Sequence, residues 1–284
     1  MKLNKKDLWA LYEEVAREYN ETPLSKTYGF ECLCNQEKFD ELCAIAEHLP
    51  DKDGVFVDLG TGMGIAPRFA KKLGARAITY DAPFAEHTLE NAALAGIECH
   101  LLDFTQAGLP LEAETADCML FADVIEHLVS SPRPILQEMH RVLKKGGAVV
   151  SSTPNATRLS VRVKIAFGFS NWPVVDDFFY SDHHGGHHHE YTSDEFQRVF
   201  RLANFEIEMF RLYGSIGTIA VPSLKLLGSR TRKRSEIGQG LRDHPVITLA
   251  KMVVVPLEKM HKPFRPQMLL VAVKPPGTSV VQPG

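Results

Sequence analysis

Residues 55–64, VFVDLGTGMG, constrain the fold of this chain more than any other segment. The apolar residues predict a buried strand, and residues 65–73 after the glycine-rich turn predict a helix. Glycine has no Cβ atom, so a ligand can approach the backbone of such a turn closely. Backbone amides at the start of the helix favour an anionic group. The segment therefore predicts a nucleotide-type cofactor site at the first strand-to-helix turn of a parallel sheet.

The size and composition of the chain indicate a globular protein. Its 284 residues suffice for one large α/β core with a small appendage. A net charge of −3 argues against a polyanionic partner for the whole protein. No uninterrupted apolar segment reaches the roughly 20 residues that a membrane-spanning helix needs. The five cysteines include no Cys-x-x-Cys pair, and we expect reduced thiols in a cytoplasmic protein.

Strand and helix signals alternate along most of the chain. Strands are predicted at residues 55–59, 77–80, 98–102, 118–122, 148–153, 205–210 and 268–273. Helices are predicted at residues 5–19, 36–49, 65–73, 85–95 and 132–143. One more helix opens at Thr192, where Glu195 completes a capping box. This alternation predicts an α/β fold with a doubly wound, mostly parallel sheet of seven strands.

The chain divides into five predicted parts. They are an N-terminal helical cap (1–50), a cofactor-binding α/β core (51–155), a lid (156–190), the C-terminal part of the core (191–274) with an insertion at 214–265, and a disordered tail (275–284). The lid mixes basic, aromatic and histidine residues without a clean strand-helix unit. The tail is rich in proline, glycine and serine, which disfavours a packed structure.

Acids close the next two predicted strands. Asp81 ends the second strand, where a carboxylate can accept both hydroxyls of a ribose. Asp103 ends the third strand beside Phe104, where an acid can bind an adenine amino group next to an aromatic ring. The glycine spacing G-x-G-x-G also differs from the G-x-G-x-x-G of dinucleotide-binding proteins. Together these signals favour an adenosyl cofactor.

Five ordered segments between residues 55 and 155 resemble the motifs of class I S-adenosylmethionine (SAM)-dependent methyltransferases. They are VFVDLGTGMG, ITYDA, LLDF, ADCMLFADVIEHL and RVLKKGGAVVSSTPN. The chain is most similar to the branch that includes ubiquinone-biosynthesis O-methyltransferases, and HHHEYTSDEFQRVFRLANFEIE at 187–208 resembles the same branch. The resemblance implies a Rossmann-like methyltransferase fold with helical cap insertions, and SAM as the cofactor.

The resemblance also implies cofactor-binding roles for ten residues. They are Asp58, Gly60, Thr61, Gly62, Gly64, Asp81, Ala82, Asp103, Phe104 and Ala122. The glycines would admit the methionine part of SAM, and Asp58 would interact with its amino group. Asp81 would bind the ribose diol, and Asp103 with the amide of Phe104 would bind the adenine. Ala122 stands where the family often has a larger residue. The alternative for each acid is solvation at a strand end or capping of a turn.

Two groups of residues could serve a hydroxyl acceptor, which needs its proton removed or its oxygen held by a metal. The first is Asp123-x-x-Glu126-His127, after the fourth predicted strand. The resembling branch often has Glu-x-x-Glu-His here, and some members, the small-RNA 2′-O-methyltransferases among them, bind a divalent cation with it. These three residues are therefore candidate metal ligands, and Glu126 and His127 are candidate catalytic residues. The alternative is a helix-start acid beside a hydrogen-bonded histidine.

The second group is a segment with five histidines within the seven positions 183–189. Its position within HHHEYT makes His189 the first candidate for a general base, by resemblance to related enzymes. The other histidines are interpreted as part of a polar loop, although imidazole is a common metal ligand. A combined site, in which a histidine of this segment meets Asp123, Glu126 and His127, is a further hypothesis.

The insertion at 214–265 carries ten basic residues against three acidic ones, between two apolar stretches. The first interpretation is a helical cap that closes the acceptor pocket or joins two subunits in a homodimer. The second is peripheral contact with a membrane surface, where the cations would meet anionic lipid. Either role suits a large or apolar acceptor.

The sequence thus predicts a methyltransferase that methylates an oxygen of a small-molecule, lipid-linked or glycan acceptor. An RNA 2′-O-methyltransferase is an alternative, but it needs a continuous basic groove, whereas the cations of this chain are concentrated in one insertion. A SAM-binding regulatory subunit without catalytic activity is the third hypothesis.

Overall fold

The structure is a computed structural model that describes residues 3–23, 25, 32–50, 53–83, 86–103, 108–168, 179, 186–214 and 262–277. The chain forms two compact units. The first, here called the core unit, comprises Met1–Thr153, Gly185–Phe210 and Leu269–Gly284, and the second comprises Pro154–His184 and Arg211–Met268. The predicted site residues lie in the segments of the core unit.

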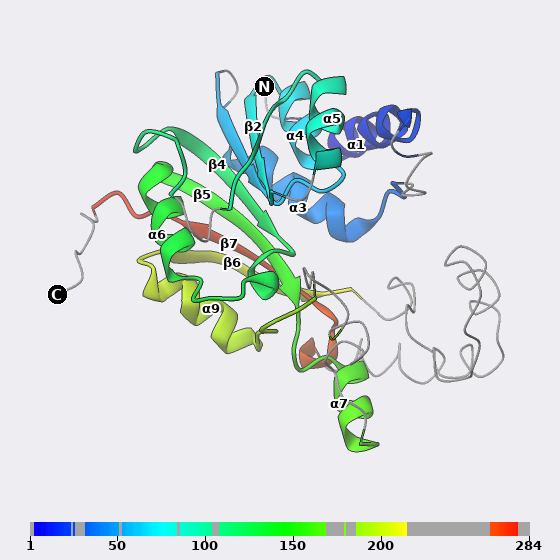
Figure 1. Ribbon diagram of the computed structural model, residues 1–284, viewed down its shortest axis with the longest axis vertical. Coiled ribbons are helices and arrows are strands. Elements are labelled where there is room, and N and C mark those ends of the chain that lie inside the picture. The colour runs from blue at the N-terminus through cyan, green and yellow to red at the C-terminus, as the bar shows by residue number, and fades with distance from the viewer. Residues whose placement is uncertain are drawn as a thin grey trace. The chain divides into compact units, whose positions relative to one another are not determined.

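Seven strands form one sheet in the order β3-β2-β1-β4-β5-β7-β6 (Figure 1). Their bounds are β1 (Val55–Leu59), β2 (Arg76–Asp81), β3 (Glu98–Leu101), β4 (Ala116–Ala122), β5 (Leu143–Pro154), β6 (Glu206–Tyr213) and β7 (Gln267–Val273). β1 pairs in parallel with β2 and β4, β2 with β3, and β4 with β5. The predicted doubly wound, seven-stranded α/β fold is confirmed.

The two central strands are buried along almost their whole length. Phe56 and Val57 on β1 and Met119 and Phe121 on β4 are all fully buried. Parallel strands covered on both faces are continuous apolar runs of this kind. The chain leaves β1 toward β2 and β3 on one side and later returns to place β4 on the other side. The carboxyl ends of β1 and β4 therefore flank the topological switch point, where ligands of such sheets bind.

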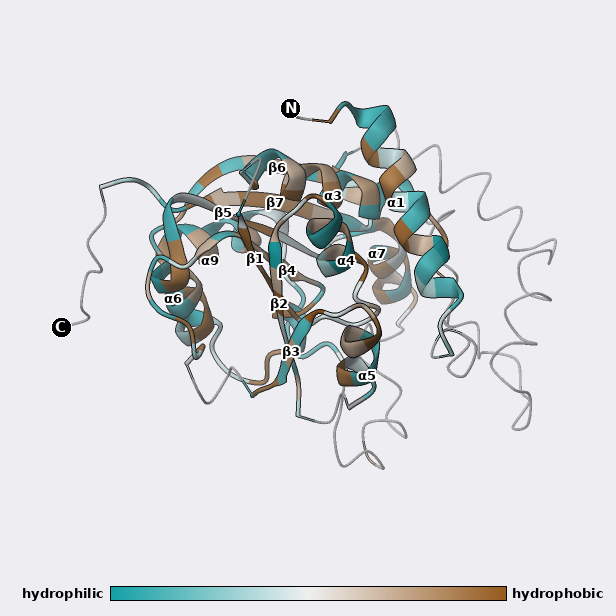
Figure 2. Cartoon of the chain, turned by 90° about the horizontal axis from the view of Figure 1, so that it is seen from above, coloured by the Kyte–Doolittle hydropathy of each residue, from teal (hydrophilic) through white to brown (hydrophobic). Residues whose placement is uncertain are grey.

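Helices cover both faces of the sheet in the core unit. They are α1 (Lys5–Asn20), α3 (Gln36–His48), α4 (Ile65–Lys72), α5 (Glu86–Leu94), α6 (Arg133–Val142) and α9 (Ser193–Leu202). Two views show α1, α3, α4 and α5 on one side and α6 and α9 on the other (Figures 1 and 2). Hydrophobic residues are prominent in the centre of the sheet, whereas α1 carries hydrophobic and hydrophilic residues on different sides (Figure 2). The second unit contains α7 (Leu159–Ala166) and the short η2 turn (Lys262–Phe264).

Neighbouring residues in the sequence explain where α9 begins. They do not explain where β5 begins. Thr192 and Glu195 form the predicted capping box at the start of α9. By contrast, β5 begins at Leu143, before the predicted strand at 148–153. The reason is a distant partner, because Gly146 donates to the carbonyl of Lys274 at 2.8 Å, and Lys274 donates to Gly147 at 2.9 Å. Gly146 has a φ of +79°, which the absence of a Cβ atom permits.

Several predicted features lie outside the described residues. They are Phe104, residues 169–178 and 180–185 of the lid, residues 215–261 of the insertion and residues 278–284 of the tail. The cap, homodimer and membrane hypotheses for 214–265 therefore stay predictions. Among the described helices, none has both the length and the apolar composition needed to cross a membrane.

Candidate cofactor and catalytic site

The turn between β1 and α4 depends on glycine at three positions. Gly60, Gly62 and Gly64 have φ angles of +86°, +50° and +68°, in the region that side chains with a Cβ atom rarely adopt. At Gly60 a Cβ atom would also lie 2.4 Å from Cγ2 of Val124. At Gly62 a Cβ atom would meet no described atom within 4 Å, so this backbone faces open space. The turn can therefore be approached closely by a ligand at Gly62.

Two polar side-chain atoms at the carboxyl end of β1 are buried. Among the residues that the structure describes, neither Oδ1 of Asp58 nor Oγ1 of Thr61 has a hydrogen-bond partner, although both are buried. Burial raises the pKa of Asp58 to about 7, and the charges of Asp81 and Glu41 act in the same direction while Lys38 opposes them. Buried acceptors without a donor are costly, so a ligand that supplies donors here would be favoured.

Asp81 lies at the carboxyl end of β2 and is oriented by backbone amides. Its Oδ1 accepts from Ala82 at 2.8 Å and its Oδ2 accepts from Gly62 at 3.2 Å. Burial raises the pKa of Asp81, and these amides oppose the rise. Ala122 ends β4, and Asp103 is an exposed residue two positions after β3. The structure thus places Asp58, Asp81 and Ala122 at the carboxyl ends of neighbouring strands.

The carboxylate of Glu126 is the buried centre of a second group. Glu126 lies in the η1 turn (Ile125–His127) directly after β4 and is fully buried. Its Oε2 accepts from Oγ1 of Thr153 at 2.9 Å, whereas its Oε1 has no hydrogen-bond partner among the described residues. Burial raises the pKa of Glu126 to about 7, and the charge of Asp123 adds to this effect. A carboxyl group with a pKa near neutrality can take or give a proton.

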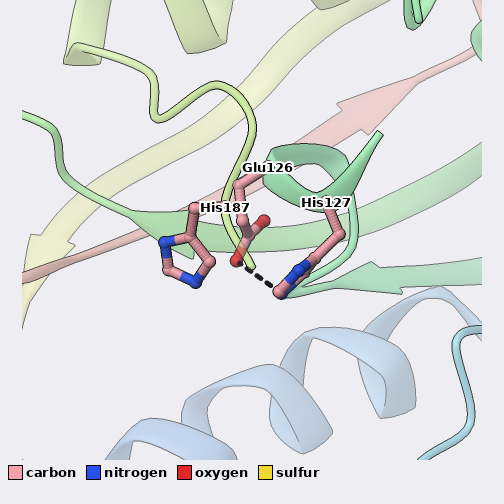
Figure 3. Close-up of side chains that lie close together, drawn as sticks. All are labelled: Glu126, His127 and His187. Carbon is pink, nitrogen blue, oxygen red and sulfur yellow. Dashed lines mark ion pairs between the residues drawn. The ribbon is translucent and has the colours of Figure 1, made fainter. Parts of the chain in front are cut away.

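Two imidazole rings meet this carboxylate. One donor or acceptor atom each of Glu126, His127 and His187 lies within 4.8 Å of the others. In Figure 3 the carboxylate lies between the two rings. Nε2 of His127 is 4.0 Å from Oε1 of Glu126, and the ring centroids of His127 and His187 are 4.8 Å apart. We call these three residues the Glu-His-His cluster.

The outer nitrogens of both rings contact oxygen atoms. Nδ1 of His127 lies 3.2 Å from the carbonyl of Gly186, and Nδ1 of His187 lies 2.7 Å from Oε1 of Glu190. A carbonyl or carboxylate oxygen only accepts, so each Nδ1 is the donor. In the neutral rings each Nε2 then carries the lone pair, which can bind a proton or a metal ion. The cluster therefore offers two imidazole lone pairs and a carboxylate oxygen.

The structure brings together some of the predicted catalytic and metal-binding residues. Glu126 and His127 lie together, and the histidine beside them is His187, which the sequence analysis assigned to a polar loop. The ring of His189 is exposed and packs against Tyr191, with centroids 4.5 Å apart. Asp123 is not one of the clustered residues. The contact between Nδ1 of His187 and Glu190, three positions later, distinguishes His187 only in the structure.

Two residues of α3 were missed by sequence reasoning. Nζ of Lys38 lies 2.6 Å from Oε2 of Glu41. Lys38 also interacts electrostatically with Asp58 and Asp123. Burial raises the pKa of Asp123 to about 6, with Glu41 adding to this and Lys38 opposing it. The helix that was predicted only as part of a cap thus supplies charges to the site.

A family model described as a methyltransferase domain matches residues 35–209. The chain belongs to this methyltransferase family. It is 32% identical over 112 residues to a ubiquinone biosynthesis O-methyltransferase of Parvibaculum lavamentivorans, a match that covers 38% of this chain and 43% of that protein. It is 33% identical over 117 residues to a ribosomal protein L11 methyltransferase of Dictyoglomus thermophilum. That match covers 40% of this chain and 37% of that protein. The chain thus spans less than half the length of either relative.

The methyltransferase fold extends over most of the chain. A SAM-dependent methyltransferase structure from Archaeoglobus fulgidus aligns with a TM-score of 0.53 over 84% of this chain and 95% of that one, at 14% identity. Family membership confirms the predicted class I SAM-dependent methyltransferase and its cofactor. The residues present fit SAM, because the unpartnered oxygens of Asp58 and Thr61 suit its ammonium group and the open side of Gly62 admits a ligand.

Cofactor binding is expected to weaken as the pH falls below about 7, the value to which burial raises the pKa of Asp58. In the role predicted for Asp58, protonation removes the charge that attracts the ammonium group of S-adenosylhomocysteine (SAH), so the Kd for SAH should rise by up to about tenfold per pH unit. Calorimetry with SAH across this range measures the effect. Asp58→Asn should bind SAH weakly at every pH, and a variant that kept the wild-type pH profile would contradict this role.

The unfolding free energy of the free protein depends on pH in the opposite sense to SAH binding, because of the same residue, Asp58. The folded protein holds the Asp58 proton up to a pH of about 7, whereas an unfolded aspartate loses it near about 4. The contribution of Asp58 to the unfolding free energy therefore decreases as the pH rises between these two values. SAH binding and stability of the free protein thus change in opposite directions over this range.

Proposed function

We propose that this chain transfers the methyl group of SAM to an oxygen atom of a small-molecule or lipid-linked acceptor. The observation that carries the proposal is the Glu-His-His cluster directly after β4, on the same edge of the sheet as Asp58 and Asp81. A hydroxyl acceptor must lose a proton, whereas an acidic thiol or carboxylate acceptor need not. The O-methyltransferase named among the relatives supports the same choice of atom.

In this proposal His187 accepts the hydroxyl proton. SAM, when bound, supplies an electrophilic methyl carbon. Holding the hydroxyl in line with that carbon can contribute about 7–11 kcal/mol toward the barrier. The proton goes to Nε2 of His187, because Glu190 at 2.7 Å from Nδ1 orients the ring and stabilises its charged form. The buried carboxylate of Glu126 stabilises the positive charge that develops on the neighbouring rings.

The same cluster suits a divalent cation. Two imidazoles and one carboxylate match the preferences of transition metals such as Zn²⁺ or Mn²⁺ better than those of Mg²⁺. The contacts from Gly186 and Glu190 to the outer nitrogens are of the kind that orient metal-bound histidines. A bound cation would lower the pKa of a hydroxyl acceptor. Because Nε2 of His187 cannot bind a cation and a proton together, we propose Glu126, His127 and His187 as cation ligands as the alternative to proton transfer, and the role predicted for Asp123 stays a prediction.

Removal of metal is expected to lower the methyl-transfer rate by at least about tenfold, with recovery when Mn²⁺ or Zn²⁺ is returned. The measurement is methyl release by chelator-treated protein, together with its metal content by mass spectrometry. His127→Ala should lose both the metal and its effect on rate. Full activity in protein shown to be metal-free would contradict the cation and leave proton transfer to His187 as the mechanism.

The identity of the methyl-accepting atom is tested with compounds that differ only at that atom. Matched phenol, thiophenol and aniline compounds, together with a lipid-linked hydroxyl, are incubated with labelled SAM, and methyl transfer is counted. Turnover restricted to hydroxyl compounds supports the proposal. Turnover on thiol or amine compounds alone contradicts it. SAH binding without turnover on any acceptor would favour a regulatory subunit.

A further inference from the structure

Asn91 on α5 contacts the glycine-rich turn directly. Its side-chain Nδ2 donates to the carbonyl of Met63 at 2.7 Å. Met63 lies between Gly62 and Gly64, which both have positive φ angles. Nδ2 of Asn91 would also lie 3.2 Å from a Cβ atom placed on Gly64. The conformation of the turn is therefore coupled to the position of one asparagine.

Arg68 on α4 fixes the orientation of the Asn91 side chain. One guanidinium nitrogen donates to Oδ1 of Asn91 at 2.6 Å and to its main-chain carbonyl at 3.0 Å. Both residues are buried, with 7% of Arg68 and 4% of Asn91 exposed. Because a guanidinium only donates, Oδ1 must face Arg68, and Nδ2 must face Met63. The buried cation thus determines which end of the amide meets the turn.

The Arg68 contact also completes the end of α5. The carbonyl of Asn91 belongs to the last turn of that helix, where carbonyls lack partners within the helix and cations are favoured. One turn further along α4, Nζ of Lys71 donates to the carbonyls of Ala95 and Gly96 at 2.7 and 2.9 Å. Two residues of α4 therefore hold the end of α5, but only Arg68 acts on Asn91.

Hydrogen bonds to residues of β2 and α5 anchor the turn. Gly60 donates to the carbonyl of Tyr80 at 2.8 Å, and Gly62 donates to Oδ2 of Asp81 at 3.2 Å. The third anchor is the contact from Asn91 to Met63. The first two come from β2, and the third comes from the helix that follows β2. The methionine side of the cofactor site is thus connected to the segment that carries the ribose-binding candidate Asp81.

We propose that Asn91 is a positioning residue for the cofactor. By holding the carbonyl of Met63, it keeps the turn from Gly60 to Gly64 in its binding conformation before SAM arrives. A preformed turn loses less conformational freedom on binding, and affinity for the ligand increases accordingly. The inference rests on the proposed role of this turn in SAM binding and adds a residue that acts through Met63 alone.

Asn91→Asp separates this role from packing. Aspartate keeps an oxygen for Arg68 but presents a second oxygen, in place of an N–H, to the carbonyl of Met63. The Kd for SAH should rise by about tenfold. The KM for SAM should rise in parallel, while kcat at saturating SAM changes by less than about twofold. Calorimetry and steady-state kinetics measure these values, and circular dichroism verifies the fold.

Lys71→Ala is the matched control, because it removes the other contact between α4 and α5 and leaves Asn91 in place. Its Kd for SAH should stay within about twofold of wild type. Should Asn91→Asp not fold, Asn91→Ala removes the same donor without adding charge and carries the same test. An unchanged Kd in the folded variant, or an equal rise in Lys71→Ala, overturns the proposal. Wild-type protein that fails to bind SAH would instead overturn the cofactor site itself.

Discussion

Replacing Glu126 with glutamine is expected to lower kcat by about 10³-fold, while the Kd for SAH stays within about twofold of wild type. Glutamine has nearly the same shape and can still accept the hydrogen bond from Thr153 at 2.9 Å. It has no negative charge, however, so it cannot stabilise a protonated ring or a cation beside it. The variant should therefore lose catalysis and keep its cofactor affinity. Steady-state kinetics and SAH calorimetry give the two values.

The melting temperature of Glu126→Gln distinguishes a loss of catalysis from misfolding. Burial raises the pKa of Glu126 to about 7, so the ionised carboxylate destabilises the folded state above that pH. A neutral glutamine should leave the melting temperature unchanged or raise it, which is the trade-off expected at a functional site.

Asp117→Asn is the matched control for Glu126→Gln. Asp117 lies on β4 but near its opposite end, where it accepts from the amide of Val55 and from Nζ of Lys144, both at 2.8 Å. That variant should melt at a lower temperature without a loss of kcat. A Glu126→Gln enzyme with nearly wild-type kcat would rule out the cluster as the catalytic group.

Asp81→Ala is expected to raise the Kd for SAH by about 100-fold. The carboxylate is held in place by the amides of Gly62 and Ala82, so it is oriented before the ligand binds. In the role predicted for Asp81, its loss removes hydrogen bonds to the ribose, and it also removes one anchor of the glycine-rich turn. Isothermal calorimetry with SAH measures the change.

Glu98→Ala is the matched control for Asp81→Ala. Glu98 is a carboxylate on the neighbouring β3 that is committed to Arg76 at 2.8 Å and His100 at 2.9 Å. Its replacement should leave the Kd for SAH within about twofold, because exposed ion pairs contribute little. Equal affinities of Asp81→Ala and wild-type protein would remove Asp81 from the cofactor site.

The sheet was largely predictable because its central strands are buried on both faces. β1 and β4 are apolar apart from one aspartate each, and such runs are recognisable without any knowledge of their partners. The helix start at Thr192 was predictable for a similar reason, since a capping box lies within four consecutive residues. The start of β5 was not, because it depends on hydrogen bonds with Lys274, far along the chain. Local patterns thus predict elements, and long-range pairing decides their ends.

The site was predictable to the extent that its residues lie beside a strand end. Asp58, Asp81 and Glu126 follow or close apolar runs, so the sheet itself determines where they lie. His187 could not be chosen among its neighbours, because a histidine-rich segment has no periodicity that shows which ring points inward. The structure makes this choice through Glu190, which lies 2.7 Å from the outer nitrogen of His187. The contribution of Lys38 depends on how α3 packs, and no local motif encodes it.

The main chain of Glu126 also accepts hydrogen bonds. Its carbonyl accepts from the amides of His188 at 2.7 Å and His189 at 3.2 Å. One residue therefore provides the buried carboxylate and also tethers the segment that brings His187 to it. Detaching that segment would break both hydrogen bonds and remove the imidazole of His187 together, leaving His127 beside Glu126. The proposed proton transfer therefore depends on these two main-chain hydrogen bonds as well as on the side chains of the cluster.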